Sequence, residues 1–207
     1  MMNIIAKKVN CFLFGVFLLL LATPSSAQVS RTASSQGKSF SNSLTQLNMS
    51  FNFPEGFKEV KAPNTEEMPF DYGMELPDQD FEVWLRLNTH KEDEKFLADK
   101  NIRVANADSL YLSLARDQIS SFTSDNSTLI KRNIPDHILE RYNADAGSTF
   151  LISIDDSQVT KHYKYALLIV VQKNKVGTVL AICFTNDKGP EFFKNMKLVG
   201  SCLRFKD

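Results

Sequence analysis

The residue types that bind metals are few in this sequence, and they are not spaced as ligands. The histidines are far apart along the chain: His90, His137 and His162. No two of them stand four residues apart, the spacing that places two imidazoles on one face of a helix around zinc. The acidic pairs Asp78/Asp80 and Asp155/Asp156 lack the glycine and the distal glutamate of a calcium-binding loop. The sequence therefore predicts no metal site, and we expect both acidic pairs in solvated turns.

The motifs of covalent catalysis and of phosphate binding are also missing. Gly200-Ser201-Cys202 does not form Gly-x-Ser-x-Gly, and its serine falls at the end of a predicted helix rather than at a strand-to-helix turn. The sequence has no glycine-rich phosphate loop with its lysine. We therefore predict no cofactor, no catalytic residue and a protein that is not an enzyme. One alternative stays open, a hydrolase whose two carboxylates meet only in the folded chain.

Trp84 is the main candidate for a binding residue. It lies between Glu82 and Arg86 on the more polar face of a predicted strand, where an exposed indole would stack on a ligand or a partner protein. The alternative is that residues 90–100 or the N-terminal leader fold over the indole and bury it. The two hypotheses differ in one observable, the exposure of the Trp84 side chain.

Two cysteines remain after the predicted N-terminal processing, Cys183 in a predicted strand and Cys202 after the C-terminal helix. In an oxidising compartment they can form a disulfide if their Cα atoms come within about 7 Å of each other. The alternative is a pair of buried free thiols that act as small apolar side chains. We expect the C-terminal helix to pack on the strand that carries Cys183.

Residues 1–27 have the pattern of a secretory signal peptide, with a basic start, an apolar run at 11–22 and small residues before a cleavage site. The apolar run of about twelve residues is shorter than the ~20 that a membrane-spanning helix needs, so we expect no stable membrane insertion. Residues 28–45 are rich in serine and predict a flexible leader. We therefore expect an exported protein, periplasmic or extracellular.

The charge balance argues against nucleic acid as a partner. The chain has 24 basic and 24 acidic residues, and loss of Lys7 and Lys8 with the signal peptide leaves a net charge near −2. The basic residues form no cluster of the kind that binds DNA or RNA. An unidentified protein is the partner that we expect.

Alternating apolar residues predict strands, and one hairpin is apolar on both faces. Its strands are Lys161–Val171 and Gly177–Thr185, and a strand that is apolar on both faces is buried on both. We therefore expect this hairpin in the middle of a sheet, with layers above and below. The other predicted strands are Asn48–Phe53, Phe70–Leu76, Phe81–Leu87 and Thr149–Ile154.

Apolar residues at helical spacing predict the covering layers. The expected helices are Asp108–Phe122, Pro135–Tyr142 and a C-terminal helix that begins at Gly189-Pro190. Residues 90–100 are charged, and we expect a solvated loop with a fragment of helix. Short turns between consecutive strands imply antiparallel pairing. The predicted fold is α+β, an antiparallel sheet of about six strands flanked by helices as an α/β/α sandwich, in a single domain over residues 46–207.

Three segments of the chain resemble a known fold group. They are Phe51–Phe57, with its Pro-x-Gly, then Tyr142–Gly147, and the Tyr163–Val171 strand with Phe184-Thr185-Asn186-Asp187. Over residues 48–205 the chain resembles small exported bacterial proteins of uncharacterised function, related in fold to the PsbP-like (Mog-type) group. That group includes an extrinsic subunit of photosystem II and a nuclear-transport protein that binds the Ran GTPase. Its look-alikes carry tryptophan where this chain has Ala146, and the metal-linked histidines of the photosystem subunit have no counterpart here.

The resemblance implies an antiparallel sheet between helical layers and a non-catalytic role. Asn143, Asp145 and Gly147 fit a helix end and a turn, and the alternative is a polar binding site at that corner. The function that we expect is an exported accessory or binding module that docks a protein partner in the cell envelope, through Trp84 and Asp145. A small-ligand carrier, with a pocket between sheet and helix, is the alternative.

Overall fold

The computed structural model of the chain describes residues 34–101, 109–124 and 129–207. They belong to one compact unit, Ala33–Asp207. The predicted signal peptide over residues 1–27, the leader residues 28–33 and the predicted helix start at residue 108 lie outside the described residues.

The described residues form one large antiparallel sheet and one small one. The large sheet has seven strands, in the spatial order β2 (Lys58–Val60), β3 (Tyr72–Glu75), β4 (Phe81–Thr89), β8 (Gly177–Thr185), β7 (Tyr165–Lys173), β6 (Ala146–Ser153) and β5 (Ile130–Asn133). The small sheet pairs β1 (Met49–Phe51) with β9 (Leu203–Phe205). All pairings are antiparallel, as the short connections between consecutive strands predict.

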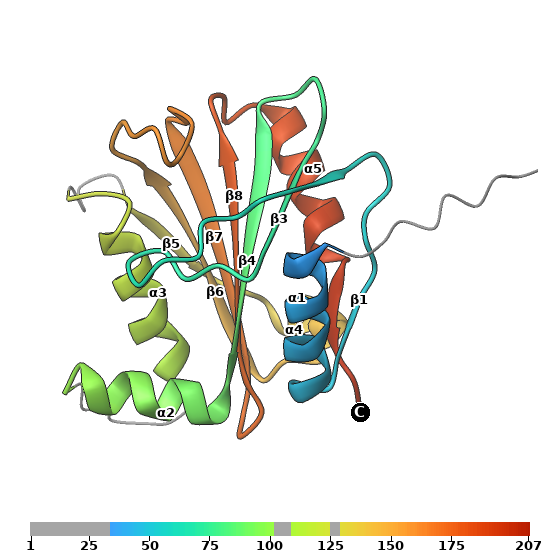
Figure 1. Ribbon diagram of the computed structural model, residues 1–207, viewed down its shortest axis with the longest axis vertical. Helices are drawn as coiled ribbons and strands as arrows, with labels where there is room; N and C mark the ends of the chain where they lie inside the picture. The colour runs from blue at the N-terminus through green and yellow to red at the C-terminus, as the bar shows by residue number, and fades with distance from the viewer. Residues whose placement is uncertain (1–33, 102–108, 125–128) are drawn as a thin grey trace, which may run out of the picture. The chain divides into compact units, whose positions relative to one another are not determined.

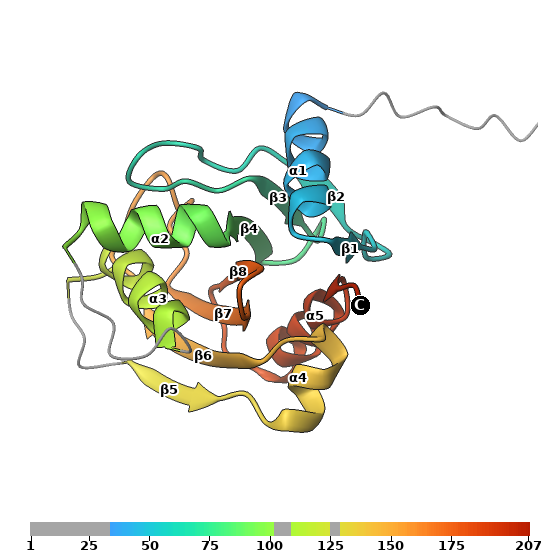
Figure 2. The same ribbon diagram turned by 90° about the horizontal axis from the view of Figure 1, so that it is seen from below.

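Helices cover both faces of the large sheet (Figures 1 and 2). One face carries α2 (His90–Asp99) and α3 (Leu110–Ser120), and the other carries α1 (Ser35–Gln46), α4 (Asp136–Tyr142) and α5 (Pro190–Gly200). The predicted α+β class, with helices flanking an antiparallel sheet, is confirmed. The short strands β2, β5 and β9 were not predicted, because three or four residues are too few to show an alternation.

The hairpin β7–β8 lies in the middle of the sheet, as its composition predicts. Every residue of β8 is buried, and so are Ala166 to Gln172 of β7. Leu167 and Ile169 pack toward α4 and α5, whereas Leu168 and Val170 pack toward α3. Strand β7 begins at Tyr165 rather than at the predicted Lys161. Lys161 and His162 have left-handed backbone conformations, with φ of 51° and 61°, which no strand accommodates.

The prediction of a flexible leader over residues 28–45 is wrong from Ser35 onward, because α1 occupies Ser35–Gln46. Ser34 caps the helix by accepting a hydrogen bond from the Gly37 backbone N–H. Phe40 is 2 % exposed, and its ring stacks on Tyr72 with centroids 4.6 Å apart. One buried aromatic side chain thus fixes a helix whose other residues are mostly polar.

The charged segment after β4 is also more ordered than predicted. Residues 90–99 form the full helix α2, which a capping box begins: Thr89 Oγ1 accepts the Glu92 N–H, and Glu92 accepts the Thr89 N–H in return. Asp93 is the buried residue of α2. A helix that is polar on nearly all sides thus begins at a capping box, and its buried residue is a carboxylate that accepts a hydrogen bond from Thr178 of β8.

Candidate functional site

Trp84 is buried, so its predicted role as an exposed binding surface is wrong. The side chain is 2 % exposed. Three aromatic rings surround the indole, those of Phe70, Phe122 and Phe184, at centroid distances of 5.3, 6.3 and 4.5 Å. Phe70 and Phe122 thus cover the face of β4 that carries Trp84.

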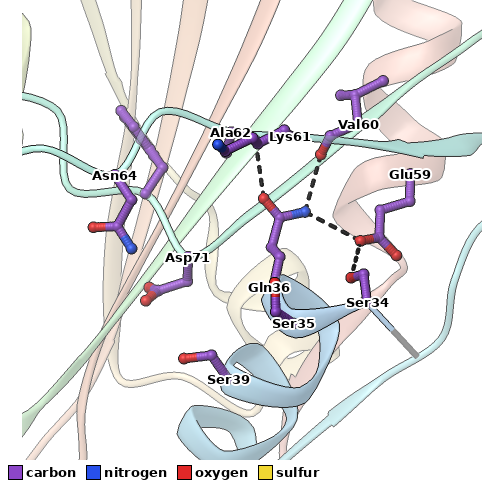
Figure 3. Close-up of a pocket in the computed structure, with 11 residues that line it drawn as sticks. Ser34, Ser35, Gln36, Ser39, Glu59, Val60, Lys61, Ala62, Asn64 and Asp71 are labelled. Atoms are coloured by element: carbon purple, nitrogen blue, oxygen red, sulfur yellow. Dashed lines mark hydrogen bonds between the residues drawn. The ribbon is translucent and has the colours of Figure 1, made fainter. Parts of the chain in front are cut away.

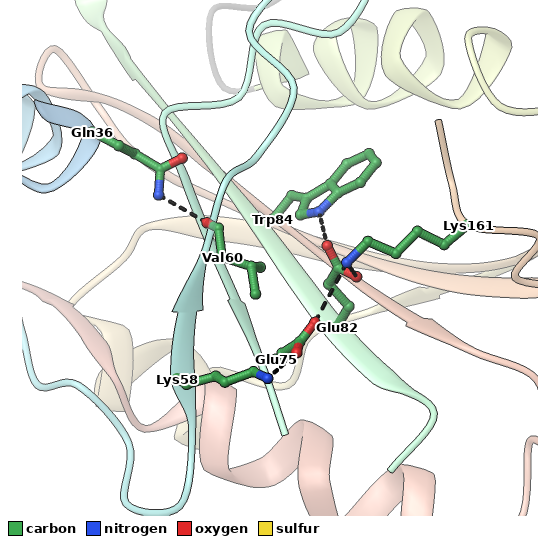
Figure 4. Close-up of polar contacts among 7 residues, drawn as sticks. All are labelled: Gln36, Lys58, Val60, Glu75, Glu82, Trp84 and Lys161. Atoms are coloured by element: carbon green, nitrogen blue, oxygen red, sulfur yellow. Dashed lines mark hydrogen bonds and ion pairs between the residues drawn. The ribbon is translucent and has the colours of Figure 1, made fainter. Parts of the chain in front are cut away.

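Glu82 is buried next to Trp84 and holds a polar cluster at one end of β4 (Figure 4). Its Oε1 accepts the indole N–H of Trp84 at 2.8 Å, and its Oε2 lies 2.6 Å from the Lys161 ammonium. Burial alone would lower the pKa of Lys161, but the hydrogen bond and the charge of Glu82 outweigh it and raise that pKa. Both carboxylate oxygens of Glu82 thus have partners inside the protein.

Replacing Lys161 by methionine should destabilise the protein by about 1–3 kcal/mol, because it leaves the buried Glu82 carboxylate without its counter-ion. Methionine keeps an unbranched aliphatic stem, and it has the same backbone preferences as lysine at this left-handed position. The matched control is Lys58→Met, which removes a partner of Glu75 from a surface ion pair of 2.9 Å and should cost no more than about 1 kcal/mol. Urea unfolding of both variants measures the difference, and equal losses would contradict the assignment.

Arg86 is also committed to internal contacts. Its Nε donates to Asn88 Oδ1 at 3.0 Å and one terminal nitrogen donates to Gln118 Oε1 at 3.2 Å. Burial lowers the pKa of the guanidinium, and neighbouring carboxylates, Asp117 first, work against that change. The guanidinium group thus joins β4 to α3.

The corner after α4 has the structural role that was one of its two predicted alternatives. Asn143 ends α4 in the left-handed conformation, and its side-chain amide donates to the Phe205 carbonyl at 3.1 Å. Asp145 accepts the Asn174 N–H at 2.7 Å and so closes the turn between β7 and β8. The polar groups of Asn143 and Asp145 thus tie α4 to β9 and to the central hairpin. Asp145 is also exposed, so a binding role at this corner stays a prediction.

Cys183 and Cys202 are free and buried thiols, so the disulfide alternative is not realised in this structure. Cys202 Sγ donates to the Leu198 carbonyl at 2.9 Å. Burial raises the pKa of both thiols, that of Cys202 to about 12, which keeps them protonated and poorly nucleophilic. Their role is to fill space between β8 and α5.

A cleft of about 510 Å³ lies between the first turn of α1 and the end of β2 (Figure 3). Serine and glutamine side chains line its helix side, and charged, polar and apolar side chains line its sheet side. The lining includes Ser34, Ser35, Gln36 and Ser39 of the helix side, and Glu59, Val60, Lys61, Ala62, Asn64, Phe70 and Asp71 of the sheet side. None of these residues was predicted as a site, since the sequence places the helix side in a leader.

Gln36 bonds to the chain at the end of β2 from inside this cleft. Its amide Nε2 donates to the Val60 carbonyl at 2.9 Å, and its Oε1 accepts the Ala62 N–H at 2.9 Å (Figure 3). One carboxamide thus bonds a carbonyl and an N–H two residues apart. Val60 pairs with Gly73 of β3, and a Cβ added at Gly73 would lie 2.7 Å from the Val60 carbonyl oxygen and 3.0 Å from the Ala62 nitrogen. These two groups therefore face β3, and Gln36 joins α1 to the chain where β2 ends.

Two carboxylates line the cleft, those of Glu59 and Asp71. Figure 3 shows the Gln36 side chain between Glu59 and Asp71. Glu59 Oε1 accepts from Ser34 Oγ, and Glu59 Oε2 accepts from the Tyr72 hydroxyl at 3.3 Å. Burial raises the pKa of the Asp71 carboxyl, against the hydrogen bond from the Leu87 N–H. Both carboxylates are thus held by hydrogen bonds, and the hydrolase alternative stays a prediction.

The described residues contain neither a metal-binding cluster nor a helix that could span a membrane. No group of three or more His, Cys, Asp or Glu side chains in residues 34–101, 109–124 and 129–207 is arranged to hold a metal ion. None of the described helices is long and apolar enough to cross a membrane.

No protein-family model matches the sequence, and no curated protein matches it significantly. The resemblance to the PsbP-like group therefore stays a prediction. Assignment of a function rests on the geometry of the cleft.

Proposed function

We propose that the protein is a non-catalytic accessory module, exported to the cell envelope, that docks an extended segment of a partner protein in the cleft beside α1. The observation that carries the proposal is the cleft of about 510 Å³ next to β2, a strand that pairs on one side only. An extended partner segment beside β2 would offer the amides of its own backbone to the unpaired side of that strand.

The position of β2 supports docking by strand addition. It is the terminal strand of the large sheet, paired on one side only, with β3. An extended peptide that adds to such an edge gains affinity from main-chain hydrogen bonds and specificity from alternate side chains. The cleft provides room for those side chains, because it runs from the β2 edge to Phe70 and Asp71.

A small-ligand carrier is the second candidate, and the cleft volume favours it. About 510 Å³ falls within the range of ~300–1,000 Å³ that is usual for ligand pockets. The cleft lies between a helix and the sheet, as a carrier would require. Photo-crosslinking and native mass spectrometry separate the two candidates.

Photo-crosslinking from inside the cleft tests the docking function. A photoreactive phenylalanine at Lys61 or at Ser39, in the full chain in its native host, should form an adduct with a protein. Mass spectrometry should map that adduct to one extended segment of the partner. The matched control is the same residue at Lys131, which is exposed on β5 at the opposite edge of the sheet.

Adducts with one protein from both cleft positions, and none of that protein from Lys131, would support docking. The same adducts from all three positions, or no protein adduct from the cleft, would contradict it. A small molecule that native mass spectrometry finds on the purified protein, and that Lys61→Glu releases, would favour the carrier instead.

A further inference from the structure

From the charges of the cleft we infer that the docked segment carries a basic side chain, lysine or arginine, which the Asp71 carboxylate receives inside the cleft. This inference rests on the proposed function, since it names the residue class that the same site would select. It goes beyond that function because the main-chain hydrogen bonds of strand addition do not discriminate between sequences.

Asp71 has a carboxylate oxygen available for such a contact. Its Oδ2 accepts the Leu87 N–H at 2.7 Å, which fixes the orientation of the carboxyl group. No described residue donates a hydrogen bond to its Oδ1. Figure 3 shows the carboxylate on the Asn64 and Ser39 side of the cleft, away from Gln36. A cationic group that enters the cleft would therefore meet a carboxylate that is already held in place.

The other charges of the site leave an excess of negative charge. Glu59 and Asp71 are the acids of the lining, and Lys61 is its basic residue. Arg86 is near enough to Asp71 to lower the pKa of that carboxyl, but its guanidinium donates to Asn88 and Gln118. A basic side chain in the cleft thus adds the charge that the lining lacks, whereas an acidic one would be repelled.

The surroundings of Asp71 strengthen the expected selectivity. Burial raises the pKa of its carboxyl, which shows that water solvates the charged form incompletely. A charge-assisted hydrogen bond to an ammonium or guanidinium group would replace that missing solvation.

Three peptides test the inference. They are blocked at both ends, alternate threonine with valine, and differ only in a central arginine, glutamine or glutamate. Fluorescence anisotropy with the purified protein should show the arginine peptide binding about ten-fold more tightly than the glutamine peptide. The glutamate peptide should bind most weakly. The arginine preference should shrink as salt is added.

The Asp71→Asn variant should bind the arginine and glutamine peptides equally, because its side-chain oxygen can still accept the Leu87 N–H but the charge is gone. Asp78→Asn is the matched control. It removes the same charge from the turn between β3 and β4, outside the cleft, and should keep the preference. Thermal unfolding of both variants checks that they are folded.

The outcomes separate this inference from the function on which it rests. Equal binding of the arginine and glutamine peptides to the wild-type protein would overturn the basic side chain and leave strand docking intact. An arginine preference that survives Asp71→Asn would overturn the role of Asp71. Binding of none of the peptides would overturn both this inference and the docking function.

Discussion

Replacing Trp84 by alanine should lower the free energy of unfolding by about 3–5 kcal/mol, a large fraction of the stability of an ordinary domain. The indole fills the space between Phe70, Phe122 and Phe184, which come from three separate parts of the chain. Truncation leaves a cavity among these rings and also removes the N–H that Glu82 accepts. Urea unfolding followed by circular dichroism measures the loss.

Trp84→Phe separates the two contributions. Phenylalanine keeps much of the aromatic contact but has no N–H, so Glu82 Oε1 loses its donor and the expected loss is about 1–3 kcal/mol. A loss below about 1 kcal/mol for Trp84→Ala would mean that the indole is not a packing centre. That result would restore the hypothesis of an exposed binding residue.

The central hairpin could be predicted because burial on both faces of the sheet is what explains its sequence. Strand β8 begins and ends where predicted, at Gly177 and Thr185, since nine consecutive residues that suit a buried strand leave little freedom. Strand β7 was predicted four residues too long at its start. Alternation continues through Lys161 and Tyr163, but the left-handed backbone at Lys161 depends on the loop and has no signal in the pattern.

Helix α1 could not be predicted from composition. Its residues are mostly serine, asparagine and other polar types, and the helix exists because Phe40 reaches Tyr72 and Phe51 in the fold. The same limit applies to Trp84. Period 2 assigns the indole to a face, but it does not say which distant segments cover that face. Phe70 and Phe122 precede or follow regular elements, so their role in covering the indole is visible only in three dimensions.

The candidate site was missed for a related reason. Gln36, Glu59 and Asp71 are ordinary polar residues in the sequence, and no motif joins them. They line one cleft because α1 folds back to the edge of β2, an element too short to predict. Trp84 and Asp145 are the conspicuous residues of the sequence, and both have contacts within the fold. Trp84 packs among three aromatic rings, and Asp145 accepts the Asn174 N–H.

The other face of the sheet buries a carboxylate with no counter-ion of its own, and this has a consequence for stability. Asp93 is 1 % exposed; its Oδ2 accepts from Thr178 Oγ1 at 2.8 Å, and its Oδ1 has no hydrogen-bond donor among the described residues. The positive charge of Arg86 lowers the pKa of Asp93, but the Arg86 guanidinium donates its hydrogen bonds to Asn88 and Gln118. Burial therefore raises the pKa of Asp93 to about 7, against weaker opposing effects of Thr178 and Asn88.

Replacing Asp93 by asparagine should stabilise the protein at neutral and higher pH. The unfolded carboxyl has its ordinary pKa of 3.8 and the folded one a pKa of about 7, so unfolding releases a proton between these values. The wild-type protein therefore loses stability as the pH rises through this window, and above it the loss is constant. Each pKa unit corresponds to about 1.4 kcal/mol, so the full loss is about 4 kcal/mol and the variant should recover much of it.

Urea unfolding of wild type and variant across this pH window measures the effect as a difference between two curves. The two proteins should be nearly equal below the lower pKa, where Asp93 is neutral in both states, and should diverge as the pH rises. Asp99→Asn is the matched control, because Asp99 is exposed at the other end of α2 and its removal should leave the wild-type profile unchanged. Parallel profiles for wild type and Asp93→Asn would show that the buried carboxylate is ionised at little cost, which would place an unidentified cation or water beside its Oδ1.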